Sequence, residues 1–400
     1  MTTPTFHQTT GLSINVFQPT IALTEATENS AVYVPEGTLF ETLTNVISAY
    51  GHILTAVGGF WEAKITMLGS QLTLERWLQQ GLGKHIVVKD EGANTVWEGY
   101  VDKVTINAAG LSTVVGGLRD MANRASVIYS TTDTSVDPPQ VGIRDETPIS
   151  EDADSQRRYG ILMQVLSTGG VTATAALQIR DMYVAERSKP AMTKQLDLSG
   201  TSGQQSITLD CLGYHAWLSY IFRSTTTGLQ NASAKLAAVL DADVNSLFSS
   251  ANASIATNTE QVKAFETRNE TAWAHVKDIV GRGDASDDRQ LFGIGPGRFV
   301  TYGPAPTEVE YHQYITGESQ QVTTVYGAPV KPWQVRPGKW LRFPDLLAGH
   351  TFPTDLRDSP RSMFIERVIY TAPYGLQLEG GPTDRIPQLI AGMGLSGIGG

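Results

Sequence analysis

Alternation of apolar and polar residues is the clearest pattern along this chain. In the run 61–68 (WEAKITML) and again in 96–106 (VWEGYVDKVTI), apolar residues mostly occupy every second position. This is the period of a β-strand with one face buried and one face in water. Both runs are therefore predicted to be strands of an antiparallel sheet.

A helix is predicted between these two strands. Leu74, Trp77 and Leu78 lie three and four positions apart, so they share one face of a helix, and Gly81 ends it. The apolar run 85–90 then resumes as a strand. Together these elements predict a small antiparallel barrel, or a strongly curved sheet, with one helix packed against it.

The segment 364–370, which continues through a turn into 376–381, is a weaker copy of the pattern in 97–106. Both have an aromatic residue, a glutamate, alternating apolar residues, a glycine turn and a Gly-Gly end. Many unrelated β-hairpins share these features. Internal duplication and chance similarity are equal alternatives at this point.

The remaining patterns predict further elements in chain order. These are a hairpin over 54–68 that turns at Gly58 and Gly59, a polar link over 130–151, a strand at 161–166, a helix over 172–187, a strand at 206–213 continued through 217–222, a helix over 231–248, a linker over 249–258, a helix over 271–281, and strands and turns from 299 to 370. The chain is thus predicted to be rich in strands, with a few amphipathic helices.

Six short runs follow one another in a characteristic order. They are WEGYV (97–101), MANRASVIY (121–129), EDADSQRRYG (151–160), ALQIRDMY (176–183), LDCLGY (209–214) and WQVRPGK (333–339). None is chemically diagnostic alone, but the ordered set resembles the tail hub proteins of tailed bacteriophages. That resemblance implies two related barrel domains per chain and a homotrimer, whose ring of six barrels matches a sixfold tail tube to a threefold tip.

The resemblance implies an α+β, β-rich fold class, with two small antiparallel tail-tube-like β-barrels and α/β insertions. The expected division is 1–130 for the first barrel, 131–195 for an α/β excursion, 196–260 for the start of the second barrel with a helix, 261–330 for a small α/β insertion, 331–388 for the closing strands of the second barrel, and 389–400 for a flexible tail.

The function that the resemblance implies is structural and non-enzymatic. The chain would be the central hub of the tail tip or baseplate and would form part of the DNA-ejection channel. The expected partners are two further copies of the chain, a distal tail ring or tail tube protein, the tape-measure protein and tail fibre or spike proteins, with transient contact to passing DNA and no stable membrane insertion. The expected location is the virion tail tip, after assembly in the host cytoplasm.

Composition limits the possible partners. The net charge of −10 over 400 residues argues against a stable nucleic-acid grip, which needs clustered Lys and Arg. Acidic side chains lining a channel would let DNA slide, but an ordinary acidic surface explains the same charge. No N-terminal signal peptide is expected, and no run approaches the ~18 apolar residues of a membrane helix.

The search for chemistry is mostly negative. The glycine-rich 293–298 lacks the Gly-Lys-Ser/Thr of a phosphate loop, and Pro296 removes a backbone donor. His350, Asp355 and Asp358 suit a surface loop better than a metal or hydrolase site. The acidic run 151–154 lacks the ligand spacing of a calcium loop. We therefore expect no catalytic, metal-binding or cofactor-binding residue.

Cys211 has a simple structural interpretation, whereas Trp333 and Trp340 have two interpretations each. Cys211, flanked by leucines and the single cysteine, is predicted to be a buried inert thiol. Trp333 and Trp340 fit either a subunit contact or a rigid turn into the last strands. The functional alternatives are a tail-associated cell-wall hydrolase, a distal tail ring protein, and a tip protein that binds host carbohydrate through exposed aromatic residues.

Overall fold

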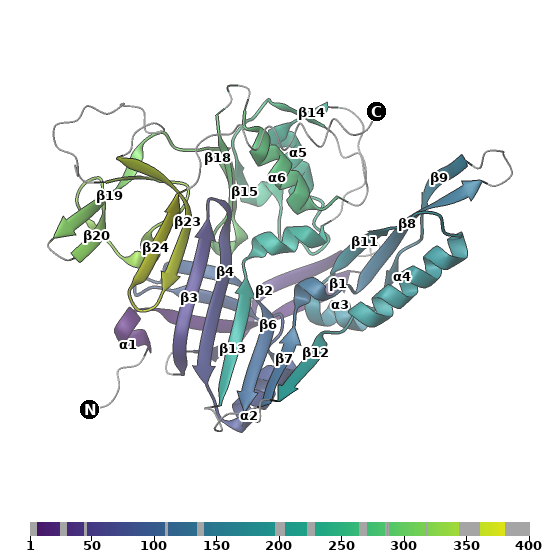
Figure 1. The fold of residues 1–400 in the computed structure, drawn as a ribbon, viewed down its shortest axis with the longest axis horizontal. Coiled ribbons are helices and arrows are strands. Elements are labelled where there is room, and N and C mark those ends of the chain that lie inside the picture. The colour runs from purple at the N-terminus through teal and green to yellow at the C-terminus, as the bar shows by residue number, and fades with distance from the viewer. Residues whose placement is uncertain are drawn as a thin grey trace.

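The computed structural model describes most of the chain and shows an elongated molecule (Figure 1). The described residues are 6–24, 30–43, 46–108, 111–133, 140–196, 205–221, 229–263, 270–284, 286, 288–316, 319–343 and 361–380. Strands predominate, and six α-helices are present among these residues. The α+β, β-rich class predicted from the sequence is confirmed.

Eight consecutive neighbours form one continuous antiparallel sheet, which we call the long sheet. In spatial order its strands are β24 (Gly375–Gly380), β23 (Ser362–Thr371), β3 (Ile47–Thr55), β4 (Val57–Leu68), β13 (Ser206–Leu212), β6 (Thr95–Ala108), β7 (Leu111–Gly116) and β12 (Ala191–Leu196). Both predicted strand runs, 61–68 and 96–106, lie near its centre. Most of these strands run side by side in front of β1 and β2 (Figure 1).

A second layer covers the inner face of the long sheet. It consists of β1 (Ser13–Thr24), β2 (Ser30–Thr42) and β5 (His85–Lys89), and β5 pairs with the first half of β6. The second half of β6 pairs with β7, so this one strand belongs to both layers. Apolar residues of the two layers form a common core, which includes Ile14, Ile65, Ile86 and Leu209.

The predicted helix is present as α2 (Gln71–Gln80) and closes one end of this core. Its N-cap is Ser70, whose side chain accepts a hydrogen bond from the Thr73 backbone N–H. Leu74 and Trp77 are buried, as their spacing predicted, and Trp77 has no exposed surface. The strand after it, β5, is also where the pattern placed it.

The curvature of the sheet is confirmed in outline, but the two predicted barrels are not. Among the described residues, no strand pair joins the outer edges of the sheet into a closed barrel. The arrangement is a curved sheet folded over one core, with the helix at its end. Local alternation predicts a curved strand run; closure depends on pairing between distant strands, which alternation does not encode.

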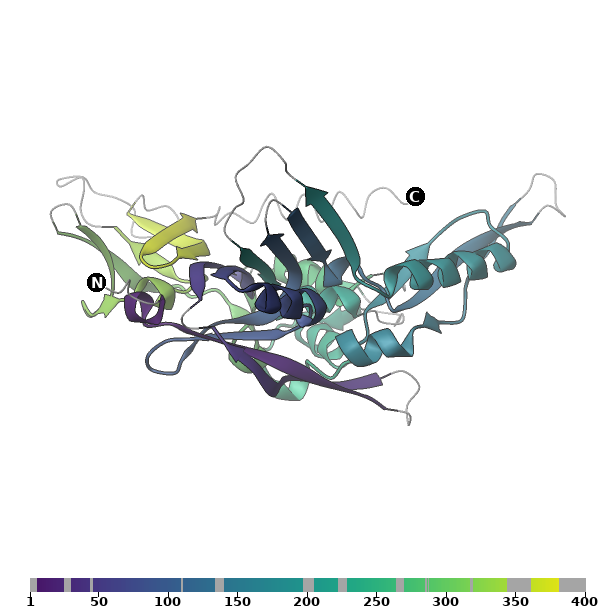
Figure 2. The same cartoon turned by 90° about the horizontal axis from the view of Figure 1, so that it is seen from below.

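A separate arm extends from one end of the molecule (Figure 2). It contains β8 (Arg124–Asp133), β9 (Gln140–Glu146), β10 (Ser150–Glu151), α3 (Ala153–Tyr159), β11 (Met163–Ser167) and α4 (Ala173–Arg187). The expected helix over 172–187 is therefore confirmed, with Thr172 as its N-cap. The expected polar link over 130–151 was wrong in part, because β9 pairs with β8 to form a hairpin.

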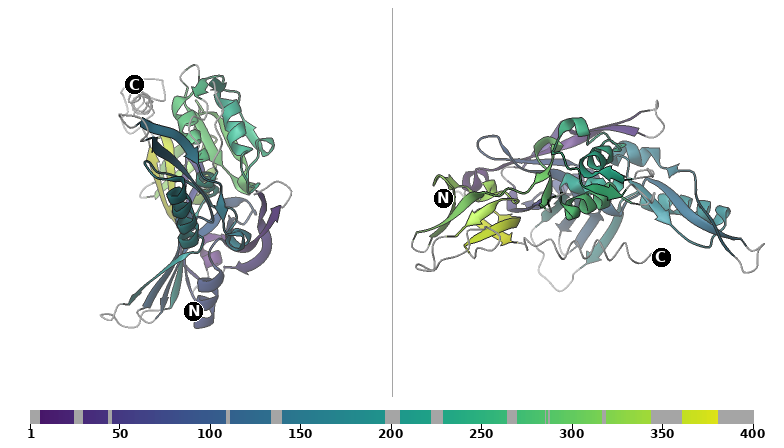
Figure 3. Two further views of the ribbon diagram at one scale, coloured as in Figure 1. Left: turned by 90° about the vertical axis from the view of Figure 1, so that its right-hand side faces the viewer. Right: turned by 90° about the horizontal axis from the view of Figure 1, so that it is seen from above.

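A third unit packs above the sheet, at the opposite end from α2 (Figure 3). Its elements are the 3₁₀ helix η3 (Tyr214–Tyr220), β14 (Leu229–Asn231), α5 (Ala232–Leu240), η4 (Ser250–Asn252), β15 (Ala253–Ile255), β16 (Gln261–Lys263), α6 (Ala272–Arg282), β17 (Gln290–Ile294), η5 (Pro296–Arg298) and β18 (Val300–Pro304). Their apolar residues form a second core that includes Trp217, Leu236, Val276 and Phe292.

Three predictions in this unit were wrong. The strand expected over 217–222 is the helix η3, whose aromatic residues are buried without alternation. The helix expected over 231–248 ends at Leu240, because the chain turns where Asp243 accepts three backbone hydrogen bonds from residues 245–248. The linker expected over 249–258 contains β15, which pairs with β18.

The last unit lies at the end opposite the arm. It comprises β19 (Val309–Thr316), β20 (Ser319–Thr324), β21 (Pro329–Val330), η6 (Pro332–Gln334) and β22 (Trp340–Arg342), which pairs with β23. The two short elements α1 (Phe6–Thr10) and η2 (Leu118–Asp120) complete the described chain. The hairpin of β3 and β4 turns through residues 56–58, because Thr55 pairs with Gly59. Gly58 and Gly59 have φ values of 120° and 76°, so the turn predicted at these two glycines is confirmed.

The division into domains at 130, 195, 260, 330 and 388 stays a prediction. Both hairpins of the suspected duplication exist, as β6–β7 and β23–β24. However, β13, assigned to the second barrel, inserts between β4 and β6 of the first. Duplication therefore remains a hypothesis about two hairpins within one sheet.

Gly213 allows the sheet and η3 to meet, and its substitution should destabilise the fold. A Cβ atom at Gly213 would lie 1.7 Å from the carbonyl oxygen of Phe60, so the backbones would have to separate. Gly213→Ala should lower the free energy of unfolding by at least about 3 kcal/mol, measured by urea denaturation. Gly281→Ala, inside α6 with open space around it, is the control and should raise stability by about 0.5–1 kcal/mol. Equal effects of the two variants would contradict this packing.

Buried histidines should make stability depend on pH. Burial lowers the pKa of His215 to about 4, and its Nδ1 donates to the Phe60 carbonyl oxygen at 3.0 Å. The unfolded chain therefore binds a proton near pH 6.5 that the folded chain does not bind, and stability falls as pH drops below 6.5. Burial also raises the pKa of Asp243 to about 6, which acts in the opposite direction. The contribution of one histidine to the pH dependence of stability must therefore be measured as a difference in unfolding free energy between the parent protein and a variant.

His215→Gln keeps a donor for the Phe60 carbonyl and removes the titration. Its stability deficit against the parent protein should shrink by about 2 kcal/mol between pH 7 and pH 5, as measured by urea unfolding at both pH values. Ile279→Val, in the neighbouring core, is the control and should show the same stability deficit at both pH values. A deficit of His215→Gln that does not change with pH would rule out a buried neutral imidazole.

Candidate assembly surface

The outer face of the long sheet carries a row of small side chains across five strands. Thr66, Thr208, Thr105, Val114 and Thr193 are direct cross-strand neighbours on β4, β13, β6, β7 and β12. On β4, β13, β6 and β7 they alternate with buried residues, and all five are partly or fully exposed. This row presents only hydroxyl and methyl groups, so it offers a contact surface and no acid, base or nucleophile pair for catalysis.

The neighbouring row on this face is mixed in charge. Lys64, Asp210 and Lys103 are cross-strand neighbours, and the Lys64 Nζ lies 3.9 Å from Asp210 Oδ1. This part of the face is therefore not uniformly acidic. These three side chains therefore do not support the hypothesis that acidic residues line a channel and let DNA slide.

Both ends of the long sheet have free edges among the described residues. β12 pairs only with β7, and β24 pairs only with β23. Every residue of β12 is exposed, and the side chains include Met192 at 53% and Leu196 at 58% exposure. A strand edge with unpaired backbone groups and exposed apolar side chains is a site for pairing with another chain.

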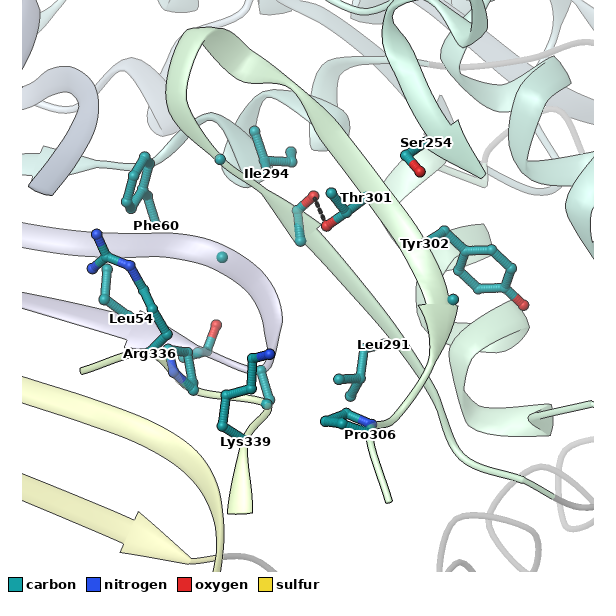
Figure 4. Close-up of a pocket in the computed structure, with 18 of the residues that line it drawn as sticks. Leu54, Phe60, Ser254, Leu291, Ile294, Thr301, Tyr302, Pro306, Arg336 and Lys339 are labelled. Atoms are coloured by element: carbon teal, nitrogen blue, oxygen red, sulfur yellow. Dashed lines mark hydrogen bonds between the residues drawn. The ribbon is translucent and has the colours of Figure 1, made fainter. Parts of the chain in front are cut away.

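A cavity of about 540 Å³ opens between the β3–β4 hairpin, the β17–β18 hairpin and residues 336–339. Figure 4 shows Arg336 and Lys339 on one side and Ile294, Thr301 and Tyr302 on the other. Burial lowers the pKa of Arg336, whose Nη1 donates to the Trp333 carbonyl oxygen at 3.2 Å. No His, Cys, Asp or Glu is among the described residues that line the cavity, so it has no imidazole or carboxylate base.

The chemistry rejected from the sequence has structural roles in the folded chain. In the glycine-rich loop 293–298, the Gly297 backbone N–H donates to Glu98 Oε2 at 2.7 Å, so the loop binds a carboxylate of the protein itself. In the acidic run 151–154, Asp152 caps α3 by accepting from the Ser155 N–H at 3.0 Å. His350, Asp355 and Asp358 lie outside the described residues.

Cys211, Trp333 and Trp340 are interior residues. Burial raises the pKa of the Cys211 thiol well above its usual value, as expected of an inert thiol. Trp333 and Trp340 are only 6% and 5% exposed, and Trp340 Nε1 donates to the Pro306 carbonyl oxygen at 2.9 Å. The interpretation of these tryptophans as a subunit contact is therefore wrong, and the rigid turn into the last strands is supported.

The free edge at β12 could not be predicted from local pattern. The pattern predicts the helix over 172–187 but no strand after it, although Met192, Lys194 and Leu196 occur two residues apart. The apolar residues of β12 are too few for a pattern with one buried face. Among the described residues, no helix is long and apolar enough to span a membrane.

Comparison with known proteins gives distant structural likenesses, among them two tail proteins. No protein-family model matches the chain, and no curated protein matches it. The 43 kDa tail protein of prophage MuSo2 from Shewanella oneidensis has a TM-score of 0.42 and 8% identity, over 86% of this chain and 95% of that chain. The tail protein from Neisseria meningitidis MC58 has a TM-score of 0.36 and 9% identity, over 94% and 98%. Both TM-scores are below 0.5, so the likenesses alone carry no argument about function.

Proposed function

We propose that this protein is a structural, non-enzymatic subunit of a bacteriophage tail, and that it is the central hub of the tail tip or baseplate. In this proposal three copies form a ring that joins a sixfold tail tube to a threefold tip and surrounds part of the DNA-ejection path. The proposal rests on the ordered sequence motifs and on the geometry of the long sheet. Its partners would be a distal tail ring or tail tube protein, the tape-measure protein, and fibre or spike proteins.

The observation that carries the proposal is the strand count and direction of the long sheet. The eight strands alternate in direction, so the two edge strands, β24 and β12, run in opposite directions. When copies of the chain are related by rotation about an axis parallel to the strands, each strand keeps its direction along that axis in every copy. The edge of β12 in one copy can then pair with β24 of the next in an antiparallel manner, and such a head-to-tail contact closes a ring.

The same count fits the proposed change of symmetry. Three copies of an eight-stranded sheet would supply 24 strands, which is four strands for each sixth of the ring. A threefold ring could thus present a sixfold repeat of strands to a neighbouring tube. The proposal includes that each group of four strands belongs to one tube-like domain.

A carbohydrate-binding tip is a second candidate, because exposed tyrosines gather at one end of the chain. Tyr326 is 95% exposed at the turn after β20, Tyr374 is 74% exposed at the β23–β24 turn, and Tyr314 on β19 is 58% exposed. Aromatic faces exposed in this way suit contact with sugars or with another protein. Binding to an array of host glycans that Tyr326→Ala abolishes would favour this candidate over the hub.

The hub proposal predicts a trimer that depends on the edge of β12. Light scattering of the purified protein should give three times the chain mass, and Met192→Asp with Leu196→Asp should give monomers, because two charges on the edge oppose strand pairing. Met182→Asp, at a 62% exposed position on α4, is the matched control and should leave the trimer intact.

Circular dichroism would establish that the variants are folded. A stable hexamer would indicate a distal tail ring protein in place of the hub. A protein that stays monomeric at all concentrations, with and without its tail partners, would overturn the proposed ring.

A further inference from the structure

Three potential metal ligands meet at the seam between the two sheet layers and the loop after β17. They are Glu36 on β2, His85 on β5 and Glu98 on β6, and one ligand atom of each lies within 4.8 Å of the others. His85 has no exposed surface, and Glu98 is 3% exposed. The cluster is distinct from the free edges and from the cavity described above.

The imidazole of His85 is oriented as metal-binding histidines are. Its Nδ1 lies 3.1 Å from the Gly99 carbonyl oxygen and 2.9 Å from the Tyr214 hydroxyl. The Gly99 carbonyl can only accept, whereas the Tyr214 hydroxyl can donate or accept. In the tautomer whose Nδ1–H donates to the Gly99 carbonyl, Nε2 carries the lone pair. Donation from one ring nitrogen to a backbone carbonyl is the usual way of aiming the other nitrogen at a metal.

The Nε2 atom of His85 lacks a hydrogen-bond partner. It is fully buried and lies 3.8 Å from Glu36 Oε1. A buried lone pair that faces a carboxylate without an intervening proton is unfavourable unless a cation lies between them.

One cation already contacts both carboxylates. Arg298 Nη1 lies 2.7 Å from Glu36 Oε1 and 3.0 Å from Glu98 Oε1, and Nη2 lies 3.1 Å from Glu36 Oε2. One guanidinium thus serves two carboxylates, which leaves the cluster with a net negative charge. The guanidinium also leaves the His85 Nε2 unpartnered.

The segment that carries Arg298 is strained and short. Arg298 has a backbone φ of 61°, a left-handed conformation that is uncommon for a residue with a side chain. It ends the 3₁₀ helix η5, and Gly297 before it has a φ of 65°.

We propose that Glu36, His85 and Glu98 form a site for a divalent transition metal, zinc first, and that Arg298 occupies the two carboxylates when the metal is absent. One imidazole nitrogen and two carboxylate oxygens, with water as the fourth ligand, are a donor set that zinc accepts. Ligand atoms ~2.0–2.2 Å from a tetrahedral zinc lie roughly 3.3–3.6 Å apart, so the present atoms, which are within 4.8 Å of one another, would have to move closer together on binding. Magnesium would bind poorly, because it prefers an all-oxygen octahedron.

The metal would connect the two layers of the sheet and release the loop. Glu36, His85 and Glu98 come from three different strands, so one ion would hold β2, β5 and β6 together. Arg298 would then be free to leave the cluster, and the residues before it, Gly295 and Pro296, line the 540 Å³ cavity. Metal binding at the seam would thus change one wall of that cavity.

Isothermal titration of the EDTA-treated, purified protein with Zn²⁺ tests the site. We expect one zinc per chain, binding at least tenfold weaker in Glu36→Gln, and at least tenfold tighter in Arg298→Ala because the competing cation is gone. Arg289→Ala is the matched control: it removes an arginine that also pairs with a glutamate, Glu366, outside the cluster, and should leave zinc affinity unchanged.

Thermal melting provides a second measurement. Arg298→Ala should melt below the parent protein in EDTA, and Zn²⁺ but not Mg²⁺ should restore its melting temperature. If Arg298→Ala binds zinc no tighter than the parent, or if Glu36→Gln binds zinc equally well, the cluster is an ion-pair network only and the metal site is rejected. Binding with several zinc ions per chain and no effect of either variant would indicate surface histidines and would also overturn the proposal.

Discussion

The rest of the structure depends on β6, a single strand that belongs to two layers at once. Residues 96–102 are buried on both faces, because Trp97 and Val101 lie in the first core while Tyr100 lies in the second core beside η3. From Lys103 onward the strand alternates, with one face on the core and one in water. The change within one strand lets the sheet fold over its own core without a break.

This bend imposes close backbone contacts. At Gly99 a Cβ atom would lie 2.2 Å from the carbonyl oxygen of Leu212, so a glycine is required where β6 passes the end of β13. The register between the two strands also shifts between Asp210 and Cys211. A shift of this kind increases twist locally, and here it coincides with the point where the sheet turns from one layer into the other.

Sequence reasoning succeeded where local period decides structure and failed where distant pairing does. The alternation around Ile65 and Val104 placed β4 and β6 correctly, and the spacing of Leu74 and Trp77 placed α2. The aromatic run around Trp217 has no clear period, so only its burial in the second core selects a 3₁₀ helix. Barrel closure could not be assessed, because it depends on which strands form the edges of the sheet.

The cluster at the seam was invisible in the sequence for the same reason. Glu36, His85 and Glu98 are 49 and 13 residues apart and follow no ligand spacing. Only the pairing of β5 with β6 and the folding of β2 over them bring the three side chains together. The contact between the glycine-rich loop and Glu98 is equally hidden, because Gly297 and Glu98 are far apart in the sequence and meet only in the folded chain.

Three arginines of this protein form ion pairs where an inserted unit meets the sheet. Arg119, in the turn that leads to the arm, contacts the buried Asp102 of β6 at 3.1 Å. Arg289, at the start of the β17–β18 hairpin, pairs with Glu366 of β23, with Nη2 to Oε2 at 2.8 Å.

Such half-buried pairs add little net stability, because removing each charge from water offsets much of the attraction. Their geometry is nevertheless demanding, since a misplaced unit would leave a buried charge without its partner. The apolar cores therefore supply most of the stability of the fold, while these few arginines fix where each insertion sits on the sheet. The contact of Arg298 with Glu36 and Glu98 is the third of this kind. It differs from the other two because the imidazole of His85 lies beside its carboxylates, so the carboxylates and the imidazole could bind one metal ion together.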